Sequence, residues 1–133
     1  MIVVDTNVIA YLLIPGDCSN LARAALRKDP YWVAPLLWRS EFRNVLTFYQ
    51  RRRQLDLRQA LQFMREAELL MQGGEYEIDS AQVLSLTANS KCSAYDCEFV
   101  ALAHDLGIPL ITSDTLVLSD FSPIAIPLQT YVS

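Results

Sequence analysis

Four acidic residues occupy positions at which carboxylates could act together: Asp5, Glu41, Asp96 and Asp114. Asp5 directly follows the apolar stretch 2–4, and Asp114 comes two residues after the stretch 110–112. Both stretches are typical of buried parallel strands, and ligands of open parallel α/β sheets bind beyond the carboxyl ends of the strands. Asp96 and Glu41 lie in the early turns of predicted helices. We therefore expect all four side chains at one rim of a sheet.

Three of these acids also have a purely structural explanation. Asp5 and Asp114 stand where helix caps are expected, and Asp is a favourable cap. Asp96 comes three residues after Ser93, which suits a variant capping box, and acids in a first turn complement the helix dipole. Taken one at a time, the capping interpretation and the catalytic interpretation both remain open.

Glu41 is harder to explain as a structural residue. The helical spacing puts it on one stripe with Leu37, Val45 and either Phe48 or Tyr49, and we expect that stripe to face the core. Buried carboxylates are uncommon unless they are paired or coordinate a metal. The spacing therefore favours a functional role for Glu41.

Converging carboxylates favour a hard divalent cation. Two like charges about 4 Å apart repel by roughly 4 kcal/mol at an effective dielectric constant near 20, so a cluster of four either protonates in part or binds a cation. Oxygen ligands suit Mg²⁺ or Mn²⁺, whereas zinc prefers His or Cys. The chain has a single histidine, His104, and no CxxC pair. A metal held in this way activates water and neutralises a scissile phosphodiester, which predicts metal-dependent phosphodiester hydrolysis.

Charge is distributed unevenly along the chain, although the net charge is only −4. Residues 39–65 hold seven arginines against two acids, and residues 66–133 hold ten acids against Lys91 alone. Such an arrangement suits a polyanion held by a basic segment near an acidic site. We name Arg39, Arg43, Arg51, Arg52 and Arg53 as candidate contacts to the phosphates of a nucleic acid such as RNA; a solvated helix face is the plain alternative.

Strand-like and helix-like segments alternate. We predict strands at 2–5, 31–34, 76–78, 110–112 and 123–127, and helices at 6–13, 19–28, 36–53, 57–71, 80–90 and 94–106. This alternation predicts an α/β fold, a three-layer α/β/α sandwich around a mostly parallel sheet of four or five short strands. No linker or repeat divides the 133 residues, so we expect a single domain over residues 1–133.

Composition narrows the setting of the protein. Apolar residues make up 52% and charged residues 20% of the chain, which argues against disorder. No apolar run is long enough to span a bilayer, and the N-terminus does not have the pattern of a signal peptide. Cys18, Cys92 and Cys97 are odd in number and are expected to be buried apolar residues. We therefore expect a cytoplasmic protein with no membrane partner.

The segments VDTNV (4–8), WRSE (38–41), SAYDCEFVALA (93–103) and LITSD (110–114), in this order, resemble the PIN-domain ribonucleases, in particular VapC-type toxins of type II toxin–antitoxin systems. The resemblance covers nearly the whole chain. It implies an enzyme that cleaves RNA with Mg²⁺ or Mn²⁺ and uses Asp5, Glu41, Asp96 and Asp114 as its acidic quartet. It also implies a homodimer and a small antitoxin partner.

The same resemblance assigns supporting roles and marks one departure. Thr6 or Asn7, and Thr112 or Ser113, fall on polar positions that orient the quartet or the attacking water. Independently of the resemblance, Thr6 or Asn7 is a candidate helix cap that would hold the turn after Asp5. Many relatives carry a further acid after the last aspartate, whereas Thr115 to Val117 follow here, which favours one metal ion. Glu98 lies about 200° around the helix from Asp96 and is expected on the surface.

Two other functions share some of these sequence features. A haloacid dehalogenase-type phosphatase also begins with an acid after a buried strand, but it needs a second Asp where this chain has Asn7. A catalytically inactive PIN-like domain that binds RNA or serves as a scaffold is expected to lose acids, and all four are present here. The glycines form no GxGxxG motif, which excludes a Rossmann-type dinucleotide site.

Overall fold

Five parallel strands form the centre of the molecule in the spatial order β3-β2-β1-β4-β5. The structure is a computed structural model and describes residues 1–133. The strands are β1 (Ile2–Val4), β2 (Trp32–Pro35), β3 (Glu75–Tyr76), β4 (Leu110–Thr112) and β5 (Ala125–Pro127). Every neighbouring pair is parallel. All five predicted strands are therefore present, within one or two residues of the predicted ends.

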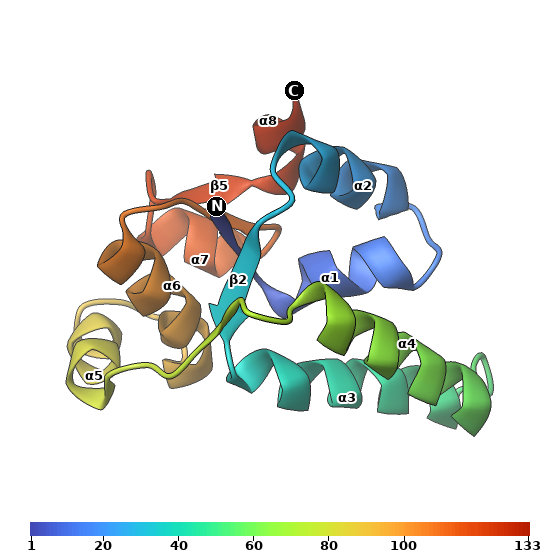
Figure 1. Cartoon of the computed structure of the whole chain (residues 1–133). Helices are drawn as coiled ribbons and strands as arrows, with labels where there is room; N and C mark the ends of the chain where they lie inside the picture. The colour runs from blue at the N-terminus through green and yellow to red at the C-terminus, as the bar shows by residue number, and fades with distance from the viewer.

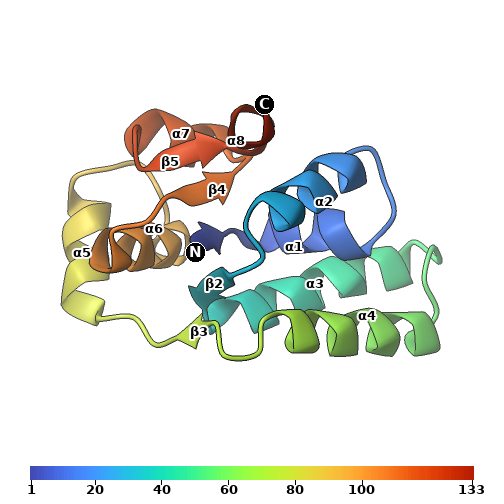
Figure 2. The same cartoon turned by 45° about the horizontal axis from the view of Figure 1, so that its top comes forward.

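Eight helices cover the sheet: α1 (Thr6–Leu13), α2 (Ser19–Lys28), α3 (Leu37–Arg51), α4 (Leu57–Leu70), α5 (Ser80–Ala88), α6 (Ala94–Leu106), α7 (Thr115–Asp120) and α8 (Leu128–Val132). Helix α6 packs against β1, β2 and β4 and carries α5 on its outer side, whereas α1 contacts β4, α2, α3 and α4. Figures 1 and 2 place α5 and α6 on one side of the sheet and α1 to α4 on the other. The predicted three-layer α/β/α sandwich is confirmed.

Local sequence signals explain where several helices begin and end. Asp56 and Gln59 form a reciprocal capping box at the start of α4. Gly107 ends α6 in the left-handed region, with φ of 65°. Gly74 is required for a different reason, since a Cβ there would lie 2.4 Å from the carbonyl oxygen of Trp32. The α4–β3 connection can therefore pass close to β2 only with a glycine at this position.

The core stripe of α3 differs from the prediction. Trp38, Phe42 and Leu46 are the buried residues of this helix. Glu41 is only half-buried, and Phe48 is 52% exposed. The most buried stripe therefore lies one residue, about 100° around the helix, from the predicted one, whose Leu37 and Val45 pack against the core while only partly buried. Glu41 lies at the edge of the core instead of inside it.

Three smaller expectations need correction. Helix α2 begins without a side-chain cap, although Asp17 and Ser19 beside its start are residue types that commonly cap helices. Helices α7 and α8 have no counterpart among the predicted helix ranges, because six and five residues are too short to display a period. Cys92 and Cys97 are buried as expected, whereas Cys18 is partly exposed. No helix has the length and apolar character needed to cross a bilayer.

Candidate acidic site

The four predicted acids line one cavity of about 240 Å³. Asp5 follows β1, Asp114 follows β4, Glu41 lies on α3 after β2, and Asp96 lies on α6. The cavity thus lies beyond the carboxyl ends of neighbouring parallel strands, where the sheet geometry predicts a ligand site. No Lys, Arg or His side chain lines it. The sequence-based expectation that these acids meet at one rim agrees with the structure.

Asp5 is held by both of its carboxylate oxygens. Oδ1 accepts the backbone N–H of Val8 at 3.0 Å, which makes Asp5 itself the N-cap of α1. Oδ2 accepts a hydrogen bond from the hydroxyl of the buried Thr112, at the end of β4. The prediction that Thr6 or Asn7 would provide this cap was therefore wrong. Capping and site formation are two roles of one carboxylate.

Asp114 and Asp96 are also fixed by helix starts. Oδ1 of Asp114 accepts the N–H groups of Leu116 and Val117, each at 3.0 Å, and so caps α7. The backbone N–H of Asp114 donates to Thr112 Oγ1 at 3.0 Å. Asp96 occupies the first turn of α6, and its N–H donates to the capping hydroxyl of Ser93 at 3.1 Å. The start of α7 therefore holds the carboxylate of Asp114, and the start of α6 fixes the backbone position of Asp96.

Glu41 is held by Thr6, whose buried hydroxyl donates to Oε1 at 2.6 Å. This bond connects the first residue of α1 to the second turn of α3. Glu98 lies near the same carboxylate, because its charge contributes to raising the pKa of Glu41. Glu98 is half-buried and does not line the cavity. The expectation that it is a surface residue was therefore only partly correct.

Burial and mutual repulsion raise the pKa values of three of the acids. Burial raises the pKa of Asp5 to about 6, the bonds from Thr112 and Val8 oppose the rise, and the charges of Asp114 and Glu41 add to it. The pKa of Glu41 is raised mainly by burial and further by Asp96. Burial and then the charge of Asp114 raise the pKa of Asp96. The site is therefore short of positive charge.

The donor set fits a hydrated divalent cation. All of its charged groups are carboxylates, and no basic side chain compensates them within the cavity. No three Asp, Glu, His or Cys side chains lie close enough together to enclose an ion by direct ligation. Mg²⁺ tolerates this arrangement, because it keeps several waters and needs only one or two direct carboxylate ligands. A closed all-protein cage, such as structural zinc requires, is not present.

The polar residues around the acids fall into two groups. Thr6, Asn7 and Thr112 line the cavity as predicted, whereas Ser113 is exposed and lies outside its lining. Asn44 lines the cavity and was not predicted. Its position three residues after Glu41 on the same helix could have indicated it, since such residues share a face.

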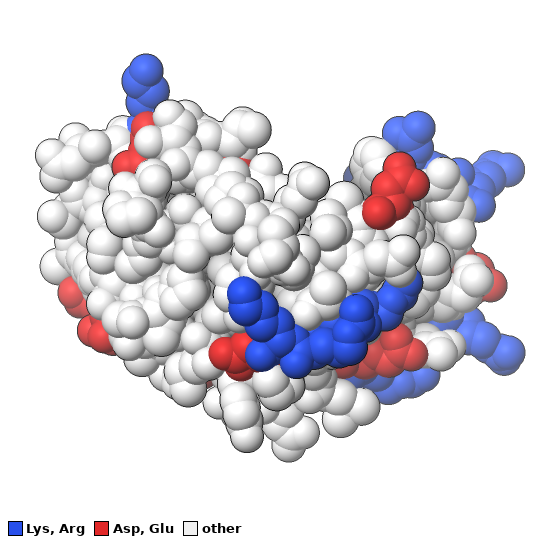
Figure 3. All heavy atoms as spheres, turned by 90° about the horizontal axis from the view of Figure 1, so that it is seen from above, with Lys and Arg blue, Asp and Glu red and all other residues white.

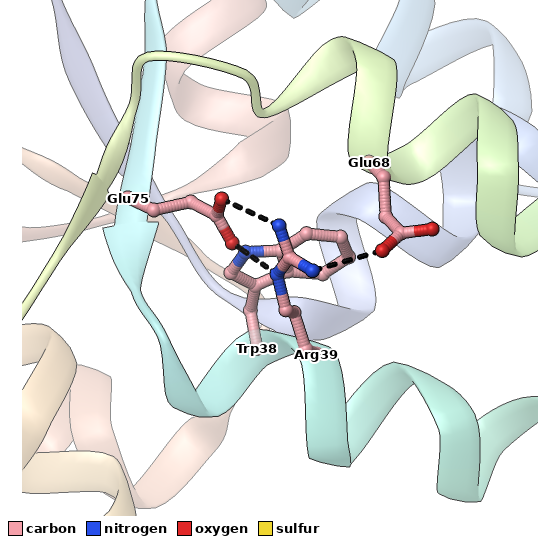
Figure 4. A network of polar contacts seen from close by, with 4 residues as sticks. All are labelled: Trp38, Arg39, Glu68 and Glu75. Carbon is pink, nitrogen blue, oxygen red and sulfur yellow. Dashed lines mark hydrogen bonds and ion pairs between the residues drawn. The ribbon is translucent and has the colours of Figure 1, made fainter.

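Arg39 differs from the other predicted RNA contacts because each of its three guanidinium nitrogens donates to an acidic side chain of the same chain. It donates to Glu75 at 2.5 and 2.8 Å and to Glu68 at 2.8 Å, and the indole N–H of Trp38 donates to the same Glu75 at 2.9 Å (Figure 4). These bonds connect α3, α4 and β3. The prediction of Arg39 as an RNA contact therefore finds no support.

The remaining arginines are solvent-accessible. Arg43, Arg51, Arg52 and Arg53 are exposed, and Arg52 lies over the ring of Phe48 at 4.9 Å. Figure 3 shows the molecule from above the view of Figure 1. Nearly all basic side chains on the face seen there lie over the half of the molecule that contains α2, α3 and α4. The uneven charge of the sequence is thus an uneven charge of the surface.

A family comparison identifies the fold. The family model described as "PIN domain" matches residues 2–120. The chain belongs to the PIN domain family. This confirms the family resemblance drawn from the sequence motifs. Among proteins of curated function, none matches the sequence.

Three solved structures have the same PIN fold. A toxin–antitoxin complex from Klebsiella pneumoniae matches with a TM-score of 0.68 over 96% of this chain and 98% of that chain. PAE2754 from Pyrobaculum aerophilum matches with a TM-score of 0.78 over 98% and 85% of the two chains. FitAcB from Neisseria gonorrhoeae matches with a TM-score of 0.76 over 97% and 99%. Each is 18% identical to this PIN domain, so these likenesses establish its fold.

Proposed function

We propose that this PIN domain is a metal-dependent endoribonuclease, the toxin of a toxin–antitoxin pair. The observation that carries the proposal is the convergence of Asp5, Glu41, Asp96 and Asp114 on one cavity without a compensating base. The stability of the fold does not require four acids at this cavity. A cation-binding site for phosphodiester hydrolysis accounts for all four together.

The chain supplies the ligands and fixes their directions. Asp5, Asp96, Asp114 and Glu41 would hold Mg²⁺ or Mn²⁺, directly or through water. The bound ion supplies an acidified water and neutralises charge on the phosphate. Thr112 and Thr6 each donate a hydrogen bond to one carboxylate, of Asp5 and Glu41 respectively, and so orient these two groups. The amides of Asn7 and Asn44 offer donors to the sugar–phosphate backbone.

RNA as substrate is supported by charge. Exposed arginines lie on α3, the helix that also carries Glu41, and on the turn that follows it. Arginine contacts to flanking phosphates would attract a polyanion that the acidic cavity by itself repels.

The toxin role is supported by relatives. One structure of the same fold is described as a toxin–antitoxin complex. By analogy we propose a small antitoxin partner, a homodimer and a cytoplasmic location for this chain. The phosphatase alternative gains no support, since the family is that of PIN domains. An inactive RNA-binding or scaffold domain is the competing proposal.

An assay of metal dependence separates the two proposals. We expect single-stranded RNA to be cleaved with Mg²⁺ or Mn²⁺, and we expect EDTA, Asp5→Asn or Asp96→Asn to abolish cleavage. Asp105→Asn is the matched control, because Asp105 is exposed near the far end of the same helix α6. Cleavage by the Asp5 and Asp96 variants at the normal rate would exclude the acidic site. A lack of cleavage with every metal and RNA would favour the inactive domain.

Manganese binding provides an independent readout. We expect Mn²⁺ to raise the melting temperature of the unmodified chain, because a ligand that binds only the folded state stabilises it. The increase should be smaller in Asp5→Asn and unchanged in Asp105→Asn.

A further inference from the structure

A second cavity adjoins the acidic site. It has a volume of about 280 Å³ and shares Asn7 and Val45 with the first cavity. Its walls come from the C-terminal half of α1, the loop 14–18, the start of α2 and the middle of α3. A substrate that occupies the acidic cavity therefore meets this second cavity directly.

The chemistry of the second cavity differs from that of the first. Tyr11 and Tyr49 supply aromatic surface, Ile14 and Pro15 supply apolar surface, and Asp17 is the only charged residue among the side chains that line the cavity. No Lys, Arg or His lines it. A second phosphate would find no positive partner here, whereas a flat aromatic group would find apolar walls and two phenol rings.

The wall of the cavity is held in place by Ser19. Its buried hydroxyl accepts the N–H of Gly16 at 3.0 Å and donates to the carbonyl of Ile14 at 3.4 Å. The N–H of Ser19 donates in turn to the carbonyl of Gly16 at 3.2 Å. The loop after α1 is thus fixed against α2, and the cavity does not depend on a ligand for its shape.

Tyr11 lines the second cavity. Burial raises the pKa of its phenol, and the nearby Cys18, Asp5 and Tyr49 contribute to the rise. Asp5 belongs to the acidic cavity, and Cys18 and Tyr49 belong to the second one. The phenol of Tyr11 is therefore close to groups on both sides of the boundary.

We propose that the second cavity binds a nucleobase of the RNA strand whose phosphate lies in the acidic site, with Tyr49 and Tyr11 as the aromatic walls. This inference rests on the proposed function, since it takes the neighbouring cavity as the phosphate site. Single-stranded RNA is commonly recognised by splayed bases that stack on aromatic side chains. The cavity would thereby select RNA whose bases are unpaired next to the cleaved bond.

A comparison of double mutants tests directly whether the second cavity binds a nucleobase. The protein carries Asp96→Asn to prevent cleavage, and its affinity for labelled oligouridylate and oligoadenylate is measured with Mg²⁺ by fluorescence anisotropy. We expect Tyr49→Leu, which keeps apolar volume but removes the ring, to weaken binding roughly tenfold, as loss of one stacked base does. Tyr49→Phe should retain the affinity. Tyr31→Ala is the control, because Tyr31 is 70% exposed and directly precedes β2, at the end of the strands opposite to the carboxyl ends where the acidic cavity lies.

The same variants are then tested on an oligomer of equal length that has ribose and phosphate but no bases. Tyr49→Leu should bind this probe as well as its parent does, because no base is left to stack. An equal loss on both probes, or no loss on either, would overturn the base site and assign the cavity to another occupant, such as a side chain of a protein partner. A parent chain that binds no oligonucleotide would overturn it as well.

Cleavage of the same oligonucleotides by the chain without Asp96→Asn separates the two proposals. If the chain cleaves RNA but Tyr49→Leu has no base-dependent effect, the base site is wrong and the nuclease function stands. If the base-dependent effect is present but no cleavage occurs with any metal, the catalytic function is wrong and the base site stands.

Discussion

Thr6 and Glu41 are joined by a hydrogen bond of 2.6 Å between side chains that lie 35 positions apart in the sequence. Thr6 begins α1 directly after Asp5, and Glu41 lies in the second turn of α3. The bond gives one oxygen of a half-buried carboxylate a hydrogen-bond donor. It also holds Glu41 close to the start of α1, next to Asp5. The hydroxyl favours the charged form of Glu41, against the burial that raises its pKa.

Replacing Thr6 by Val should therefore weaken the site without removing any acid. We expect the pKa of Glu41 to rise further, because its charged form loses a donor, and kcat/KM for RNA to fall roughly tenfold, as losses of supporting hydrogen bonds at metal sites do. Carbon-13 NMR titration of the glutamate carboxyls measures the first effect. Thr6→Ser is the matched control, since it keeps the hydroxyl. Equal pKa values for Glu41 in the Val and Ser variants would show that the bond has no electrostatic role.

Asp5 should make the metal-free protein less stable as the pH rises. Its pKa of about 6 in the folded state exceeds the ordinary value of 3.8. Because the pKa is raised in the folded state, the contribution of Asp5 to the stability of the fold is fully present below pH 3.8 and is lost as the pH rises through about 6. The shift corresponds to about 3 kcal/mol at neutral pH. Asp5→Asn should remove this dependence and be the more stable protein at pH 7 without metal.

Urea unfolding in EDTA between pH 4 and pH 7 measures this effect. The unmodified chain should lose stability relative to Asp5→Asn over this range. Metal binding should show the opposite trend, because Mg²⁺ or Mn²⁺ competes with the proton on Asp5, so affinity falls as the pH drops below about 6. Parallel stability curves for the two proteins would contradict the raised pKa.

Much of the site could be predicted because its signals are local. The apolar run before Asp5, the Ser93 cap before Asp96 and the strand before Asp114 each lie within a few residues of the acid that they position. The parallel sheet then brings these positions together by its own geometry. The partners of Arg39 could not be predicted in this way, since Glu75 and Glu68 lie 36 and 29 positions away.

The buried face of α3 was mispredicted because two stripes satisfy helical spacing. Leu37 and Val45 are four residues from Glu41 on either side, and Trp38 and Leu46 are four residues from Phe42. Contact with β2 and the other helices decides between them, and this contact is not local. In the structure the aromatic stripe of Trp38 and Phe42 is inside, with ring centroids 6.2 Å apart.

Alanine substitution distinguishes the two stripes. Phe42→Ala should lower the free energy of unfolding by about 3–5 kcal/mol, because it leaves a cavity in a fully packed core. Phe48→Ala should cost less than about 1 kcal/mol, since the ring is 52% exposed. Chemical denaturation of the two variants gives both values. A larger loss for Phe48→Ala would restore the stripe predicted from the sequence.

The arginines should divide into one structural residue and several ligand contacts. Arg39 joins α3 to α4 and β3, and its side chain is 34% exposed. Arg51, Arg52 and Arg53 follow one another at the end of α3 and make no ion pair with an acidic side chain. Arg53 adopts φ of 57°, so a neutral replacement there should tolerate the left-handed region. Asn meets this condition.

We expect the triple variant Arg51→Gln, Arg52→Gln, Arg53→Asn to fold normally and bind RNA with a weaker dependence on salt. Each phosphate contact to a single strand contributes roughly 0.7 to the slope of log K against log salt, so loss of three should reduce the slope by about 2. Arg39→Gln should instead lower the melting temperature, because Glu75 and Glu68 lose their partner, and leave the slope unchanged. Anisotropy titrations over a range of salt concentrations measure the slope, and thermal unfolding measures the stability. If Arg39→Gln reduces the slope as much as the triple variant does, its guanidinium must leave the acids to bind RNA.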